Sequence, residues 1–325
     1  MSTTVETVPV PRQVKPLSGV LSGETVFRNA TLAAAIFVLV VLTAIGISLL
    51  AAGWPALSKF GPAFLWTESW NPVKEQFGAL VPIYGTIITS LIAMVIGVPL
   101  SLGVAIFLTE LCPRPLRQPI GIAIELLAGI PSIIYGMWGL FVFAPFFADH
   151  VEPWLIDVIG PVPIIGILFQ GAPYGVGVLT AGLILAIMVL PFIASVIRDV
   201  FQTVPPMLKE SAYGLGCTTW EVVWNVVIPH TRVGIVGGVM LGLGRALGET
   251  MAITFVIGNA HRLSSSLLAP GNTISSALAN EFTEATGAIY ESSLVALGLI
   301  LFIMTFIVLA IAKWMLVRLE QRVQK

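Results

Sequence analysis

The stretch GGVMLGLGRALGETMAITFVIG, residues 237–258, decides the fold class of this sequence. It is apolar enough for the hydrocarbon of a membrane, yet it carries one arginine, Arg245, and one glutamate, Glu249. The rest of the sequence is similar: of its 325 residues 57% are hydrophobic and 10% are charged, and the mean hydropathy is +0.97. Soluble domains contain about 25% charged residues. The sequence therefore predicts an integral membrane protein.

Six runs of about 20 or more residues are almost free of charge and long enough to cross a hydrocarbon core of about 30 Å as helices. We expect helices over residues 30–52, 80–109, 119–147, 174–197, 233–259 and 292–312. The third run contains GIPSIIYG, residues 129–136, whose proline and glycines predict a kink or a break. Such a break either lines a cavity or serves helix packing, and the sequence leaves both interpretations open.

Lysine and arginine are distributed unevenly between alternate loops, which predicts the orientation of the chain. With the N-terminus in the cytoplasm, only Lys59, Lys74 and Arg262 fall outside. The inner set is Arg12, Lys15, Arg28, Arg114, Arg117, Arg198, Lys209, Arg232, Lys313, Arg318, Arg322 and Lys325. We therefore expect cytoplasmic tails over 1–29 and 318–325, a transmembrane domain over 30–317, and a cytoplasmic loop over 203–232.

The sequence argues against several kinds of site. Cys112 and Cys217 fall on the predicted cytoplasmic side, where thiols stay reduced. The three histidines, His150, His230 and His261, fall on different loops and predict no metal site. No lysine follows a glycine, so the nucleotide-binding pattern G-x-x-x-x-G-K-[ST] is absent. We expect no catalytic residues, no cofactor in this chain and no nucleic-acid partner.

The inner loop 203–232, TVPPMLKESAYGLGCTTWEVVWNVVIPHTR, predicts two short helices near 207–215 and 218–227. Gly216 would turn the chain between them, and the second helix would end before Pro229. Apolar faces are expected to consist of Leu208, Ala212 and Leu215 on the first helix and of Val222, Val223, Val226 and Val227 on the second. From these features alone, an amphipathic segment lying on lipid headgroups remains the alternative.

A more specific signal comes from Glu210, Ser211, Ala212, Gly216 and Pro229. Their spacing, E-S-A-x3-G-x9-V-V-I-P, resembles the EAA loop of ABC importer permeases, with serine at the second position and valine and isoleucine at the later aliphatic positions. The resemblance implies that the loop forms coupling helices that insert into a groove of an ATPase subunit, with Gly216 at the tight turn.

Two further stretches, GLGRALGETMA at 242–252 and LLAPGNTISSALANEF at 267–282, resemble permeases of the phosphate-specific (Pst) importers, PstC more than PstA. The likeness covers about residues 25–320. It implies the all-α ABC importer permease (MetI-like) fold with six transmembrane helices. It also implies a PstA-like permease partner, a dimer of a PstB-like ATPase that uses ATP and magnesium, and a PstS-like phosphate-binding protein. Permeases for sulfate or molybdate share this scaffold and stay open as alternatives.

The charged pair Arg245 and Glu249 is the candidate substrate pathway. Arg245 follows Arg232 by roughly 20 Å of helix, which places it near the middle of the membrane. Glu249 is expected on the same helical face. A charge at this depth must face protein or water. We expect the guanidinium to bind phosphate through two parallel hydrogen bonds and Glu249 to neutralise it when the path is empty. An ion pair with only a structural role is the alternative.

Small residues repeat along the same predicted helix, which indicates close helix packing. The glycines concerned are Gly234, Gly238 and Gly242, followed by Gly244 and Gly248. Two function classes fit this sequence: the permease subunit of an ATP-driven phosphate importer, and a self-sufficient secondary transporter with the charged pair as a proton-linked anion site. The inner loop and the lack of an internal repeat favour the permease.

Overall fold

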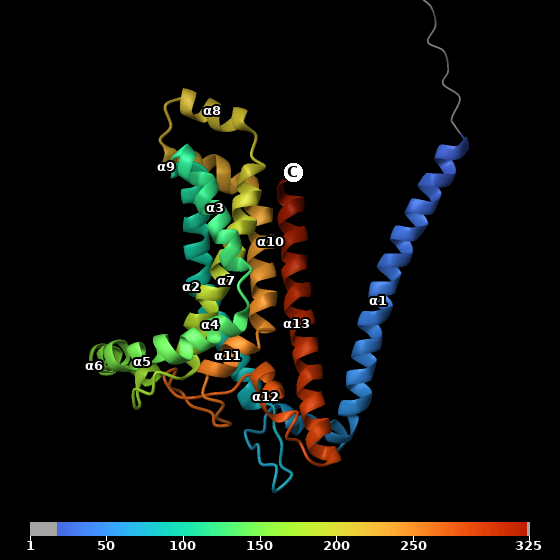
Figure 1. The fold of residues 1–325 in the computed structure, drawn as a ribbon, viewed down its shortest axis with the longest axis vertical. Helices are drawn as coiled ribbons and strands as arrows, with labels where there is room; N and C mark the ends of the chain where they lie inside the picture. Colours follow the sequence, from blue (N-terminus) through green and yellow to red (C-terminus); the bar gives the residue numbers. More distant parts are fainter. Residues whose placement is uncertain (1–17, 324–325) are drawn as a thin grey trace, which may run out of the picture. The chain divides into compact units, whose positions relative to one another are not determined.

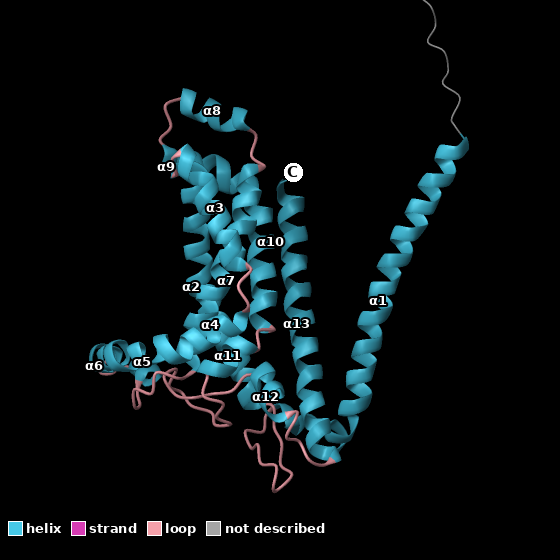
Figure 2. Cartoon of the chain, viewed as in Figure 1, coloured by secondary structure: helices cyan, strands magenta, loops and turns pink. Residues whose placement is uncertain are grey.

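The computed structural model describes residues 18–323, and side chains over 23–318. Within this range the chain is helical and contains no β-strand (Figure 2). The α-helices are α1 Ser18–Phe60, α2 Leu80–Ile106, α3 Arg114–Ala128, α4 Ser132–Trp138, α5 Ala144–Phe146, α6 Glu152–Ile159, α7 Val178–Gln202, α8 Pro206–Gly214, α9 Thr219–Val222, α10 Ile228–Leu247, α11 Met251–Val256, α12 Ile274–Glu281 and α13 Ala288–Val323. Short 3-10 helices cover Gly61–Leu65 and Gly166–Phe169, and π-helical turns cover Phe107–Leu111, Gly139–Phe143, Phe147–Val151 and Val223–Val227.

The chain divides into two compact units, residues 1–48 and 49–325. In the first unit the described residues belong to the first part of α1, whose apolar side chains, such as Phe37 and Leu39, are exposed. An exposed apolar helix of this length is suited to contact with lipid.

The second unit is built around α7. This helix is largely buried and apolar before Arg198, and it packs against α2, α3, α10 and α11. α2, α7, α10 and α13 run side by side (Figure 1). The main core lies along α7 and includes its Ile184, Leu185, Met188, Val189 and Ile193.

The two ends of this helix bundle differ. α8 lies at one end, whereas α4, α5, α6, α11 and α12 lie toward the other (Figure 1). The segment from α4 to α6 runs across the direction of α7 rather than along it (Figure 1). A second core cluster, which includes Phe64, Phe77, Ile274 and Leu297, joins the loop before α2 to α12 and α13.

Six helical segments of the described range are long and apolar enough to cross a membrane, as the sequence predicts. They are Gly23–Leu65, Leu80–Leu111, Ser132–Ile159, Val178–Gln202, Thr219–Leu247 and Ala288–Arg318. α1 begins at Ser18 and α13 continues to Val323, so helix extends into part of each predicted tail. Residues 1–17 of the predicted N-terminal tail lie outside the described range.

Two predicted helices are divided in the structure. The helix expected over 119–147 becomes α3, which ends at Ala128, and α4, which begins at Ser132. Gly129 caps α3, and Pro131 precedes α4, so the break falls inside GIPSIIYG. The helix expected over 233–259 is also not continuous, because α10 ends at Leu247 and α11 begins at Met251.

Candidate functional site

Arg245 lies in the last turn of α10, directly before the break. Its side chain is half-buried, and its Nε atom is enclosed without a hydrogen-bond partner among the described residues. The guanidinium carbon lies 5.7 Å from the ring centre of Phe192 on α7, within range of a cation–π contact. The arginine therefore keeps donors that no protein group uses.

Glu249 does not stand on the same helix as Arg245, so the prediction of a shared helical face is wrong. The helix ends at Gly248, and the Oε1 atom of Glu249 instead accepts a hydrogen bond of 3.2 Å from the backbone N–H of Ala252. Its backbone carbonyl accepts a 2.6 Å bond from Ser275 of α12. The expected ion pair between Glu249 and Arg245 is absent within the described residues. The carboxylate of Glu249, by accepting the Ala252 N–H at the start of α11, stabilises the break.

The two helix breaks meet each other in space. α4, which follows the 129–136 break, packs against α11, which follows the break after α10. A Cβ atom on Gly136 would lie 3.0 Å from the Cα of Ala252, so glycine permits this close approach. The hydroxyl of Tyr135 donates a 2.9 Å bond to the carbonyl of Leu127, across the first break. Irregular backbone in both helices thus lies close to the charged pair.

The repeated glycines of α10 differ in what they face. Three of them pack against side chains of α7: Gly234 against Val200, Gly238 against Val196, and Gly242 against Ile193. A Cβ on Gly244 would make only ordinary contact with Leu309 of α13, and Gly248 lies beyond the helix end. The close packing of this helix is therefore with α7 of the same chain.

The EAA-like loop forms α8, a turn and α9. Gly216 has φ +89, a conformation that a β-branched residue cannot readily adopt. After the turn, Thr218 and Glu221 form a capping box that starts α9. The predicted helix end before Pro229 is wrong, because a π-helical turn over Val223–Val227 joins α9 to α10. Pro229 lies in the first turn of α10, where its missing N–H is tolerated.

Most of the apolar face predicted on the second helix of this loop is buried: Val222, Val223 and Val227 are enclosed and Val226 is partly buried. On α8 the expectation fails in part, because Ala212 is buried but Leu215 is 86% exposed. Other large apolar side chains of the loop are also exposed, namely Met207, Leu208, Tyr213, Trp220 and Trp224. Glu210 and Ser211 are exposed beside them. This end of the molecule has the composition of a protein-binding surface.

A family model described as "Binding-protein-dependent transport system inner membrane component" matches residues 97–325, which include α8, α9 and the charged pair. The phosphate transport system permease protein PstC of Mesorhizobium japonicum is 66% identical over 299 residues, which cover 92% of this chain and 91% of that protein. The chain belongs to the PstC family.

More distant members match as well. PstC of Pasteurella multocida is 58% identical over 92% of this chain and 93% of that protein. The probable PstC of Methanocaldococcus jannaschii is 39% identical over 83% of this chain and 86% of its own length. The similarity thus extends over almost the whole described range in bacterial and archaeal relatives.

Solved ABC transporter structures share the fold of this PstC-family chain. A bacterial alginate ABC transporter, solved with an alginate-bound periplasmic protein, matches with a TM-score of 0.58 and 18% identity over 93% of this chain and 97% of that chain. An inward-facing methionine transporter, MetNI, matches with a TM-score of 0.50 and 16% identity over 77% of this chain and 96% of that chain. These matches confirm the predicted all-α ABC importer permease fold.

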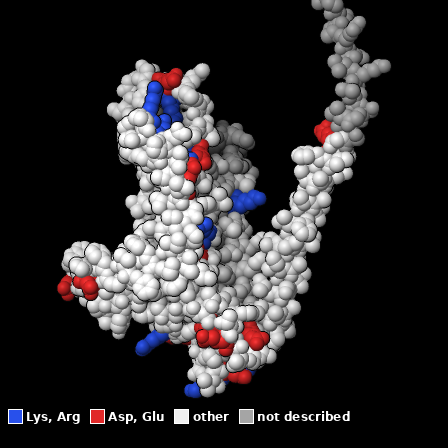
Figure 3. Space-filling model, in the orientation of Figure 1, with Lys and Arg blue, Asp and Glu red and all other residues white. Residues whose placement is uncertain are grey.

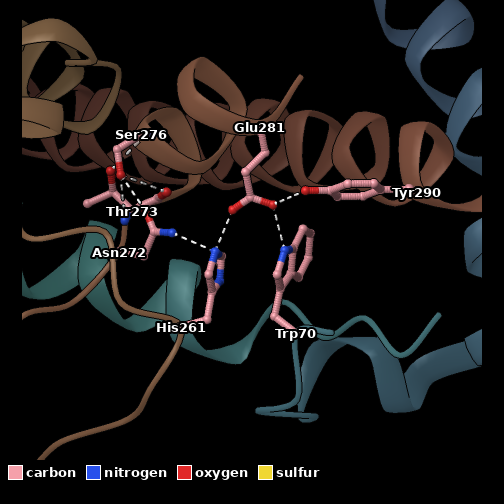
Figure 4. A network of polar contacts seen from close by, with 7 residues as sticks. All are labelled: Trp70, His261, Asn272, Thr273, Ser276, Glu281 and Tyr290. Carbon is pink, nitrogen blue, oxygen red and sulfur yellow. Dashed lines mark hydrogen bonds and ion pairs between the residues drawn. The ribbon is translucent and has the colours of Figure 1, made fainter. Parts of the chain in front are cut away.

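A second polar cluster of the PstC-family chain centres on Glu281, at the end of α12 (Figure 4). Its carboxylate accepts 2.6 Å hydrogen bonds from Trp70 Nε1 and from the Tyr290 hydroxyl. Its Oε1 lies 2.5 Å from His261 Nε2, and the His261 ring stacks on Trp70 at 5.1 Å between ring centres. Burial raises the pKa of the Glu281 carboxyl, but the bonds from His261, Tyr290 and Trp70 outweigh it and leave the pKa below its usual value.

The sequence analysis missed this Glu281 cluster. Its members come from the loop before α2, the loop after α11, α12 and α13, and their spacing along the chain gives no sign that they meet. The side chain of Glu152 is 1% exposed and accepts a 2.9 Å hydrogen bond from the Gly175 N–H.

Proposed function

We propose that this chain is the permease subunit of an ATP-driven importer of inorganic phosphate. It would form the translocation pathway with a PstA-like permease, receive phosphate from a PstS-like binding protein, and rest on a dimer of a PstB-like ATPase that uses ATP and magnesium. The PstC relatives, at 58–66% identity over 92% of this chain, support this function. The observation that carries it is the uncompensated guanidinium of Arg245 at a helix break.

The orientation that we propose places the α8 end and both termini in the cytoplasm of a prokaryote and the α12 end outside its plasma (inner) membrane. On the face drawn in Figure 3, acidic side chains gather at the α12 end, a basic cluster lies by α8, and the band between them is mostly uncharged. Basic residues concentrate on the cytoplasmic side of membrane proteins. This distribution supports the proposed orientation.

Arg245 is the residue that we expect to contact phosphate. A guanidinium can donate two parallel hydrogen bonds to a tetrahedral oxyanion, and its planar fork is more weakly hydrated than an ammonium group. Phe192 covers the guanidinium on one side, and the enclosed Nε has no protein acceptor. A phosphate oxygen would satisfy donors that the protein leaves open, while the lack of further strong ligands allows release.

We assign Glu249 a different role from the one expected. Its carboxylate holds the start of α11 through the Ala252 N–H, and its carbonyl is tied to Ser275. It therefore positions the break in which Arg245 ends α10. Glu249 follows Arg245 by only four residues, so its negative charge would weaken the binding of an anion at Arg245.

The decisive experiment is phosphate uptake per assembled complex in a strain that lacks other phosphate transporters. Arg245→Gln should reduce uptake at least 100-fold while assembly stays normal, because the oxyanion loses its charged ligand. Arg245→Lys should also be poor, since an ammonium cannot reproduce the fork. Arg28→Gln, at an exposed arginine of α1, is the control and should retain uptake.

Uptake by Arg245→Gln at the wild-type rate would overturn the pathway role. Competition by sulfate or molybdate at phosphate-like concentrations would instead identify another oxyanion as the substrate. Uptake that persists without any ATPase subunit would identify the alternative, a secondary transporter.

The exposed loop of α8 and α9 is the surface that we assign to the ATPase. Gly216→Val forces a β-branched side chain into φ +89, at a local cost of about 1–3 kcal/mol. We expect the variant to insert into the membrane but to lose stimulation of ATP hydrolysis by loaded binding protein in the reconstituted transporter. Gly214→Val is the matched control, because nothing lies within 4 Å of a Cβ at Gly214 and its φ is ordinary. Normal stimulation in Gly216→Val would contradict the coupling role.

A further inference from the structure

Two adjoining pockets lie between α3, α7 and α8, at the end of the bundle that carries the EAA-like loop. Their volumes are about 380 Å³ and about 680 Å³, and both are lined by Arg114, Arg117 and Gln202. Together they form one hollow, which we call the α3–α8 pocket. Figure 3 shows basic side chains gathered beside α8 on the face drawn.

Two of the four cations in the α3–α8 pocket already have partners. Arg198 Nη2 lies 2.5 Å from Glu125 and 2.8 Å from Asp199. Lys209 of α8 lies 2.6 Å from Glu110, whose side chain is only 6% exposed. These pairs neutralise their charges and hold the walls of the pocket in place.

Arg114 and Arg117 have no such partners. Both are exposed, and neither has an ion pair or a hydrogen bond from its side chain to any residue in the described part of the chain. They stand three residues apart on α3, so their side chains leave the same side of the helix. Glu210 of α8 is the third carboxylate of the lining, and Arg198 is shared between Glu125 and Asp199, so the formal charges around the pocket balance. Arg114 and Arg117 differ from the other two cations because their guanidinium groups have no partner among the described residues.

The start of α3 lies beside the two unpaired arginines. α3 has 15 residues, begins at Arg114, and has Pro113 as its N-cap without a side-chain hydrogen bond. The positive end of the helix dipole and the Arg114 N–H therefore face the same region as the two guanidinium groups. Two guanidinium groups without partners therefore lie at the N-terminus of a helix and beside a pocket of several hundred cubic ångströms. A phosphate group could accept hydrogen bonds from both and from the helix N-terminus.

We propose that the α3–α8 pocket binds a phosphate group, carried by inorganic phosphate or by the headgroup of an anionic phospholipid. Arg114 and Arg117 supply the bidentate donors, and the Arg198 and Lys209 pairs form the sides. Because the pocket is lined by α3, α7 and α8 together, an occupant links the membrane helices to the EAA-like loop. The inference does not rest on the proposed transport function, since Arg245 lies at the other end of α10 and does not line this pocket.

The test uses the full chain in neutral detergent with Arg245→Gln present in every sample, which removes the proposed pathway site. In one arm, equilibrium dialysis measures binding of radiolabelled inorganic phosphate. In the other arm, protein is exposed to phosphatidylcholine vesicles with or without phosphatidylglycerol, and native mass spectrometry counts the phosphatidylglycerol molecules that stay bound.

The test variant is Arg114→Gln with Arg117→Gln. The matched control, Lys74→Gln with Lys313→Gln, removes the same charge elsewhere.

We expect the arginine variant to weaken binding at least tenfold in one arm or both, while the control binds normally. Loss in the dialysis arm alone identifies inorganic phosphate, loss in the vesicle arm alone identifies a lipid headgroup, and loss in both identifies a general phosphate-group site. Equal binding by the arginine variant and the control in both arms overturns the proposal. A third variant, Arg114→Lys with Arg117→Lys, keeps both positive charges but lacks the planar guanidinium. Partial binding by this variant would show how much of the affinity comes from charge and how much from the bidentate geometry of arginine.

Discussion

Glu281 and Arg245 are both charged groups among packed helices, but their surroundings are opposite. The Glu281 carboxylate accepts hydrogen bonds from Trp70 and Tyr290 and is paired with His261 (Figure 4). Arg245 has the ring of Phe192 beside it and an enclosed Nε without an acceptor. A buried polar group is costly unless it is hydrogen-bonded. The hydrogen-bonding groups of the Glu281 carboxylate are therefore satisfied without a ligand, whereas Arg245 needs an additional acceptor to satisfy its donors.

We propose that the difference separates a charge that stabilises the fold from a charge that binds substrate. The Glu281 cluster ties together four segments that are distant in sequence, so removal of its centre should destabilise the fold. Arg245 contributes little to stability, because its donors are unused in the protein. The predictions below test this contrast, in order of decreasing effect on the free energy of unfolding.

Glu281→Ala should have the largest effect. It leaves the donors of Trp70 and Tyr290 without an acceptor and His261 without its carboxylate, and we expect a loss of about 3–5 kcal/mol, as for a broken buried ion pair. The measurement is unfolding of the purified chain in a titration of denaturing detergent. Glu284→Ala, one turn further on at an exposed position, is the control and should change stability by less than about 0.5 kcal/mol. Equal stability of the two variants would mean that the cluster has no structural role.

The pH dependence of stability gives a smaller effect from the same group. The pKa of Glu281 is lowered in the folded protein, so the folded state holds fewer protons than the unfolded state near the unfolded pKa of about 4.3. Its contribution is fully present above that pH and is lost as the pH falls through the folded pKa. Thermal unfolding at pH 7 and pH 4 should therefore show a larger drop for the wild type than for Glu281→Gln. An identical drop in both proteins would contradict this assignment.

The smallest change in stability is expected at the helix break. Arg245→Met combined with Glu249→Gln removes both charges, while the glutamine Oε1 can still accept the hydrogen bond from the Ala252 N–H, so stability should stay within about 1 kcal/mol of the wild type. Phosphate uptake should nevertheless fall to background. Assembly with the partner subunits, quantified independently, serves as the control. Substantial uptake by this double variant would show that the charges act only in packing.

Much of the fold could be predicted because it follows from composition. Six apolar runs predict six helices that can cross a membrane, and the described residues contain six helices that are long and apolar enough to do so. The turn at Gly216 was also predictable, since it stands between two amphipathic segments and adopts φ +89. Both features depend on short stretches of sequence alone. The spans follow from the length of helix needed to cross lipid, and the turn follows from the ability of glycine to adopt a positive φ.

The helix breaks and the Glu281 cluster could not be predicted in the same way. The break after α10 depends on Glu249 accepting the Ala252 N–H and on Ser275, in a different helix, bonding the Glu249 carbonyl. Helical periodicity alone favours a continuous helix and an Arg245–Glu249 pair. The cluster depends on contacts between residues up to 211 positions apart, as between Trp70 and Glu281. Single-sequence patterns carry no information about such pairs.

The unbroken helical course from α9 through the π-helical turn to α10 has a mechanical consequence. Residues Thr219–Leu247 form a rod of roughly 40 Å that begins beside the turn at Gly216 and ends at Arg245. Close-packed helices transmit displacement with little compression. A displacement applied at Trp220 would therefore be carried toward Arg245, apart from what the π-helical turn and Pro229 absorb, and residues 248–250 would act as a further joint. A stiff helix would thus connect the proposed ATPase contact at the α8–α9 loop to the proposed phosphate contact at Arg245.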